Sequence, residues 1–206
     1  MISRNNEQFL IRQSLDVQDT LGLDFATFMD YRFGVNNVNT QFTIPNTQLY
    51  AGRELIAVQG VDCPNPGMQV PIVSIVGNTA TLKYDMEGGD IEVGVAFRSS
   101  YRPTMPFIKD ADGVVIANAK LIVKNFIITL QATGEVIGRL LSKHGNGPEV
   151  KFQGRTVGDV NNVIGRVALS DDKFYMPFRD STQRADIELF TDSYLPMTFL
   201  DIEWAG

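Results

Sequence analysis

The chain has 206 residues, of which 44% are apolar and 10% aromatic, and its formal net charge at pH 7 is −6. This apolar content excludes a disordered solvating tail, and the acidic balance argues against a surface that binds phosphates through clustered Lys and Arg. The single cysteine, Cys63, cannot form an internal disulfide and is too few thiols for a cysteine metal site. The first residues lack a signal-peptide core, and no stretch approaches the roughly 20 apolar residues that span a bilayer. We therefore expect a globular protein without a membrane-spanning segment, assembled in the cytoplasm.

Short runs of alternating apolar and polar residues predict strands along nearly the whole chain. The clearest run is 91–97, and a similar run at 185–189 is expected at a sandwich edge. Between the runs lie dipeptides that tolerate positive φ and predict hairpin turns, namely Gly77-Asn78, Gly88-Gly89, Asp112-Gly113 and Thr133-Gly134. The stretch 145–148, Gly-Asn-Gly-Pro, predicts a loop.

The run 121–130 differs from the others because it is apolar on both faces. Strict alternation puts Leu121, Val123 and Ile127 on one face, and Ile122, Phe126, Ile128 and Leu130 on the other. A strand of this kind needs cover on both sides, so we expect it inside a sandwich or between subunits.

Pro103 and Pro106 mark a domain boundary within residues 98–106, because proline interrupts ladder hydrogen bonding. The sequence predicts an all-β fold, with an antiparallel β-sandwich at 103–206 and a smaller β-barrel-like domain at 46–102. Residues 1–45 are expected to add strands to the downstream sandwich.

His144 is the only histidine, so an imidazole base or zinc site would have to use it. Its neighbour Ser142 could be read as a nucleophile, but no strained nucleophile turn of the G-x-S-x-G kind is present. We interpret His144 as a solvated loop residue and expect no catalytic residues.

Two groups of acids could be read as cation or acid–base sites. Asp110 and Asp112 begin like a calcium loop, but position 119, where a bidentate Glu would stand, is Ala. The second group comprises Asp85, Glu87, Asp90 and Glu92. It could hold a cation or provide a carboxylate pair for glycoside hydrolysis. We interpret the first group as a hairpin turn and the second as a solvated rim, and expect no metal or cofactor.

Four aromatic residues could stack on sugars or bases, namely Tyr101, Tyr175, Phe178 and Trp204. We interpret them as core or interface residues. No phosphate-binding glycine loop can be read in the sequence.

The order of several segments resembles the C-terminal part of the tail tubular protein B (nozzle) family of short-tailed bacteriophages. The segments are 28–32 (Phe-Met-Asp-Tyr-Arg), 49–53, 90–103, 106–113, and the closing stretches 185–196 and 203–206 (Glu-Trp-Ala-Gly). Family members are typically longer, with a propeller-like region ahead of the matched part, so we expect either a fragment or a shortened nozzle protein.

The resemblance implies a structural protein without an active site, located in the virion tail. It implies a closed, hexameric ring of copies beneath the tail adaptor, with tail fibre proteins as neighbours, through which DNA passes during ejection. We further expect that part of the acidic surplus lines the channel, because like charge keeps DNA from adhering.

Two other functions stay open from the sequence alone. A β-sandwich with exposed aromatics could be a carbohydrate- or receptor-binding tail module. A cell-wall hydrolase using a carboxylate pair is the second alternative, and the absence of a nucleophile motif or metal signature counts against it.

Overall fold

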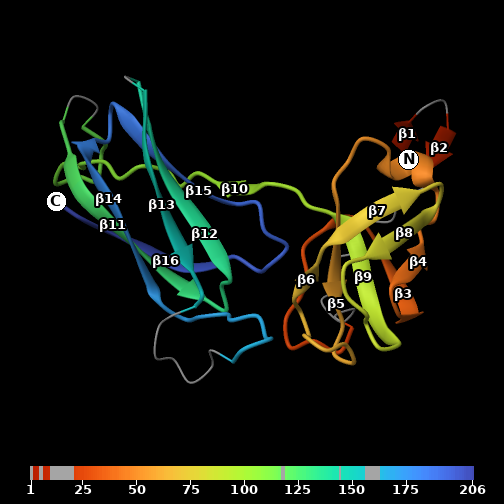
Figure 1. The fold of residues 1–206 in the computed structure, drawn as a ribbon. Helices are drawn as coiled ribbons and strands as arrows, with labels where there is room; N and C mark the ends of the chain where they lie inside the picture. The colour runs from red at the N-terminus through yellow and green to blue at the C-terminus, as the bar shows by residue number, and fades with distance from the viewer. Residues whose placement is uncertain (1, 5–6, 10–20, 117–118, 144, 156–162) are drawn as a thin grey trace. The chain divides into compact units, whose positions relative to one another are not determined.

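The computed structural model describes residues 2–4, 7–9, 21–116, 119–143, 145–155 and 163–206. They form two compact units, shown in Figure 1. Unit 1 contains the described residues up to Phe97 together with 163–167, and unit 2 contains the described residues from Arg98 onward apart from that segment. No helix among the described residues is long and apolar enough to cross a membrane.

Unit 1 contains three small antiparallel sheets. A two-stranded sheet is formed by β1 (Ile2–Arg4) and β2 (Glu7–Phe9). The largest sheet has the order β3 (Asp30–Val38), β9 (Gly89–Val95), β5 (Leu55–Gln59) and β6 (Gln69–Val70). The third has the order β4 (Gln41–Thr43), β8 (Thr79–Leu82) and β7 (Ile72–Val76), and the short helix α1 (Thr47–Tyr50) follows β4.

The four-stranded sheet of unit 1 is covered on both faces. Alternate residues of β9 face a core shared with the three-stranded sheet, to which Phe42 and Leu82 contribute. On the other face the segment 21–29 lies close against β9. A Cβ on Gly94 would lie 2.7 Å from the Cβ of Met29, so this close approach requires glycine.

Two predictions for this half of the chain are corrected by the strand pairing. The strands of the predicted barrel-like domain form two open sheets that share a core, and neither sheet closes on itself among the described residues. Within residues 1–45, β3 pairs with β9 and β4 pairs with β8, so neither strand joins the downstream sandwich. The reason is burial, because Val38 and Phe42 fill the core of unit 1. The domain limits of 46–102 and 103–206 stay predictions.

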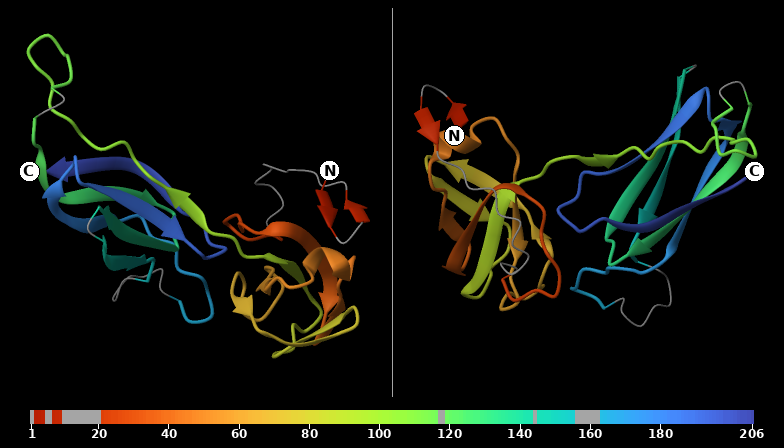
Figure 2. Two further views of the ribbon diagram at one scale, coloured as in Figure 1. Left: turned by 90° about the horizontal axis from the view of Figure 1, so that it is seen from above. Right: turned by 180° about the vertical axis from the view of Figure 1, so that it is seen from behind.

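Unit 2 is an antiparallel β-sandwich, which confirms the predicted fold class. One sheet has the order β10 (Ser99–Tyr101), β15 (Ala185–Thr191), β12 (Glu135–Ser142) and β13 (Gly145–Gln153). The other has the order β14 (Lys173–Ser181), β11 (Ile122–Gln131) and β16 (Thr198–Ala205). Figure 2 shows the two layers from two further sides. Between them the rings of Phe126 and Phe178 meet edge to face, with centroids 5.2 Å apart.

The strand β11 is apolar mainly on one face, contrary to the expectation for 121–130. Its ladder with β14 changes register between Val123 and Asn125, near Arg179, whose φ is +51°. Because of this irregularity, Val123 is buried together with Phe126, three residues later, and with Ile128 and Leu130. Strict alternation does not hold across the shift, so β11 does not need cover on both faces.

The predicted turns divide into two kinds. Gly77-Asn78 closes the hairpin of β7 and β8, and Asp112-Gly113 closes a hairpin before β11. Gly88-Gly89 and Thr133-Gly134 instead lie where the chain passes between strands of different sheets. The stretch 145–148 is part of β13 and not a loop, and Pro148 is tolerated because β13 is an edge strand.

Candidate interaction surfaces

The residues considered from the sequence as nucleophile and base are Ser142 and His144, and the single cysteine is Cys63. His144 lies outside the described residues. Ser142 ends β12, where it pairs with Gly145 and Ala185. Cys63 is buried with its thiol donating to the carbonyl oxygen of Asp90, and burial raises the pKa of the thiol.

The acidic groups have structural partners. One carboxylate oxygen of Asp110 accepts hydrogen bonds from the backbone N–H groups of Asp112 and Val114, which is the geometry of a turn. In the second group, Asp85 accepts from the N–H of Glu87. Among the described residues, no three His, Cys, Asp or Glu side chains lie close enough to hold a metal ion.

Glu92, the last member of the second group, is buried instead of lying on a solvated rim. The hydroxyl of Thr27 donates a hydrogen bond to its carboxylate, and Nε of Arg32 lies 3.0 Å from the other carboxylate oxygen. The Thr27 contact attaches the segment before β3 to β9, and the Arg32 contact joins β3 itself to β9.

A buried carboxylate that sequence reasoning missed lies on the outer face of unit 2. Glu188 on β15 is directly opposite Arg139 on β12, and its side chain is only 7% exposed. Arg139 Nη2 lies 2.7 Å from one carboxylate oxygen, and Arg102 Nη2 lies 2.8 Å from the other. Hydrogen bonds from Arg139 and then Arg102 hold the pKa of Glu188 below its usual value.

Phe190, two residues further along β15, lies on the same face and is buried between two guanidinium groups. The Cζ atoms of Arg98 and Arg139 are 4.4 and 4.9 Å from its ring centroid. Arg98 also pairs with Asp192 at 2.7 Å, and this hydrogen bond lowers the pKa of Asp192. We call Arg98, Arg102 and Arg139, with Glu188 and Phe190, the arginine cluster.

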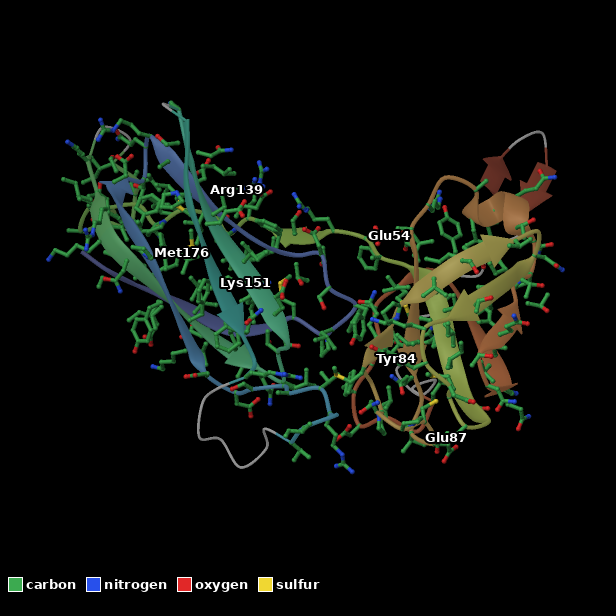
Figure 3. All side chains as sticks on the ribbon, in the orientation of Figure 1. Glu54, Tyr84, Glu87, Arg139, Lys151 and Met176 are labelled. Carbon is green, nitrogen blue, oxygen red and sulfur yellow. The ribbon has the colours of Figure 1, made fainter. Side chains whose placement is uncertain are left out.

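The ion pairs on the outer face of this sheet are balanced in charge. Figure 3 labels Arg139 and Lys151 on neighbouring strands, and Lys151 pairs with Glu135 at 2.7 Å. The ion pairs of this face join as many carboxylates as cations, namely Glu135, Glu149, Glu188 and Asp192 with Arg98, Arg102, Arg139 and Lys151. A balanced face does not attract phosphate groups.

The acidic surplus of the chain belongs to the other unit. Residues 21–97 contain eight acidic and three basic residues, a formal charge of −5, whereas residues 98–206 contain thirteen of each. Glu54 and Glu87, labelled in Figure 3, are exposed members of the acidic set. Unit 1 therefore carries nearly all of the net charge.

A hairpin of residues 107–116, the finger hairpin, carries exposed apolar side chains in unit 2. The N–H of Ile116 donates to the carbonyl oxygen of Ile108 at 2.9 Å, and the backbones of Lys109 and Val115 form an isolated antiparallel β-bridge. Figure 2 shows the hairpin extending away from the two sheets. The exposed apolar residues are Phe107, Ile108, Val114, Val115 and Ile116.

A shallow groove of about 560 Å³ lies beside β16, an edge strand of unit 2, and we call it the β16 groove. It is lined by Tyr101, Pro103, Thr104, Phe199, Leu200, Asp201 and Ile202. Of the four aromatic candidates, only Tyr101 lines it. Tyr175 and Trp204 are exposed elsewhere on the sheet, and Phe178 is in the core.

The edge strand β7 of unit 1 is exposed and uncharged. Its exposed side chains include Val73, Ile75 and Val76. The edge strands β13 and β14 of unit 2 contain Pro148 and Pro177 together with charged residues, which discourage pairing with other chains. The strand β7 contains neither a proline nor a charged residue.

Comparison with known proteins identifies the family of the chain. None of the curated proteins matches the chain. The family model described as bacteriophage nozzle protein matches residues 8–206, nearly the whole chain. The chain therefore belongs to the bacteriophage nozzle protein family and is a structural component of a phage tail.

Proposed function

We propose that copies of this chain form a closed, hexameric ring in the tail and that unit 1 lines the channel through which DNA leaves the virion. The observation that carries this proposal is the charge of −5 on residues 21–97, in contrast to the balanced charge of residues 98–206. An acidic wall repels the phosphate backbone, so DNA slides past it without being held.

The tail adaptor and tail fibre proteins are the neighbours that we propose for this ring, which would assemble in the host cytoplasm. We also propose that the chain performs no catalysis. The contacts of its acids support this, because Glu92, Asp110 and Glu188 bind backbone or arginine groups within the fold. The family match favours a tail component over a separate carbohydrate- or receptor-binding module.

Reversing charge on unit 1 tests the channel proposal. In virions carrying Glu54→Lys with Glu87→Lys, we expect DNA ejection to slow by about tenfold at low ionic strength, with the defect shrinking as salt is added. The matched control, Asp172→Lys with Asp186→Lys, makes the same charge change on unit 2 and should leave the ejection rate unchanged. Equal rates for both variants in a DNA-release assay would refute the placement of unit 1 at the channel.

Imaging tests the ring itself. Negative-stain images of the purified chain, alone and mixed with the tail adaptor, are expected to show closed rings with a central hole. A monodisperse monomer that never joins an adaptor or a tail would contradict the proposal and would direct attention to the receptor-binding alternative.

A further inference from the structure

We propose that the finger hairpin of one copy docks into the β16 groove of the neighbouring copy. This contact rests on the proposed ring, since it supplies the repeated contact by which the ring closes. It is a heterologous interface, in which two different surfaces of the same chain meet, and repetition of such a contact produces a ring when the rotation closes.

The finger hairpin is a surface that needs a partner. Its bridge places Lys109 and Val115 on one face with Phe107, whereas Ile108 and Ile116 share the opposite face. Apolar side chains are therefore exposed on both faces of a hairpin with which no third strand pairs among the residues that the structure describes. A two-stranded hairpin in this situation is marginally stable in water, and contiguous exposed apolar residues mark interaction sites.

The β16 groove combines apolar side chains with a larger share of polar surface, to which Thr104 and Asp201 contribute. The rings of Tyr101 and Phe199 lie 5.9 Å apart, and Leu200 and Ile202 add aliphatic surface beside them. The groove is open to solvent, and its volume of about 560 Å³ is within the range of pockets that bind organic ligands. Because both the finger hairpin and the groove are exposed, the finger does not fill the groove of its own chain.

Charge indicates a second copy as the occupant. The rim of the groove carries Asp201, whose carboxylate accepts the N–H of Ile202 and is exposed to solvent, and the finger carries Lys109 beside Phe107. Both surfaces belong to unit 2, whose residues 98–159 and 168–206 have a formal charge of only −1, so copies approach through unit 2 with little mutual repulsion. An approach through the acidic residues 21–97 would bring two charges of −5 together.

Cross-linking between different chains tests the contact directly. A full-length chain with Lys109→Cys is mixed with one carrying Asp201→Cys, and a short bifunctional thiol reagent is added. We expect a covalent dimer in the mixture and none with either variant alone, because the native Cys63 is buried. In the control, Asp172→Cys replaces Asp201→Cys. Asp172 is also exposed and accepts the next backbone N–H, at 2.7 Å, so a dimer there would show nonspecific reaction.

Charge exchange provides the second test. Lys109→Glu is expected to raise the chain concentration needed for half-maximal ring formation by about tenfold, and Asp201→Lys in the same chain is expected to restore it. Lys83→Glu is the matched control, because Lys83 also lies beside an aromatic ring, that of Tyr84 at 5.3 Å. This control should leave assembly unchanged.

The outcomes separate this contact from the proposed function. Rings without the specific cross-link, in the purified chain and in tails, would overturn the finger contact and leave the channel proposal standing. A specific cross-link together with tails that contain no ring would overturn the channel proposal and leave the finger contact standing. Assembly unaffected by Lys109→Glu, or a dimer formed equally well with Asp172→Cys in place of Asp201→Cys, would overturn the docking of the finger hairpin into the β16 groove.

Discussion

Replacing Phe126 by Ala is expected to lower the free energy of unfolding of unit 2 by about 3–5 kcal/mol. The side chain is 2% exposed between the two sheets, and its ring packs edge to face on Phe178. Truncation removes this apolar burial and leaves a cavity that the flanking strands can close only in part, because each is held in its ladder.

Urea unfolding followed by the fluorescence of Trp204, the only tryptophan, measures this loss, since Trp204 lies on β16 directly opposite Phe126. Phe107→Ala is the control. Its side chain is 49% exposed on the finger hairpin, so we expect a change within about 0.5 kcal/mol. If Phe107→Ala proved as destabilising as Phe126→Ala, the finger would be part of the folded core and not a docking surface.

Replacing Glu188 by Gln is expected to lower the free energy of unfolding of unit 2 by about 2–3 kcal/mol at neutral pH. This value lies between those for losing an exposed and a fully buried ion pair. The substitution keeps the shape of the side chain but leaves Arg139 and Arg102 facing a neutral amide. Glu149→Gln is the matched control. Glu149 is half exposed and lies 3.4 Å from Arg139, so its loss should cost less than about 1 kcal/mol.

Acidic pH should remove the difference between the native chain and Glu188→Gln. The pKa of Glu188 is lowered in the folded state, so its contribution is fully present above the unfolded value of about 4.3. It is lost as the pH falls through the folded-state pKa, where the carboxylate takes up a proton. Thermal melts over this range should converge, and a difference that persisted at the acid end would show that shape, not charge, stabilises the cluster.

The sequence correctly predicted the apolar face of β9. Residues 91–95 alternate cleanly, and β9 buries Ile91, Val93 and Val95 as expected. At 121–130 the same reasoning was wrong about the faces, because the register shift near Arg179 changes the phase of the alternation. The shift depends on the partner strand, which the local pattern of 121–130 does not reveal.

The arginine cluster was not predicted, for a related reason. The pattern at 185–189 put Glu188 on a polar face at a sandwich edge, yet β15 lies inside its sheet and Glu188 is buried. The groups that bury it, Arg102 and Arg139, are 86 and 49 residues away in sequence. Only the strand order brings them together. The one signal available was the presence of Glu188 and Phe190 two residues apart on a single strand face.

Because the edge strand β7 is exposed and uncharged, free chains can aggregate before they are incorporated into a tail. Two free chains that meet through such an edge begin an off-pathway aggregate, at a rate that rises with the square of the free-chain concentration. Growth of the tail removes free chains from this competition. The yield of intact tails therefore depends on how closely synthesis of this chain keeps pace with the supply of its assembly partners, and overproduction of the chain alone favours the aggregate.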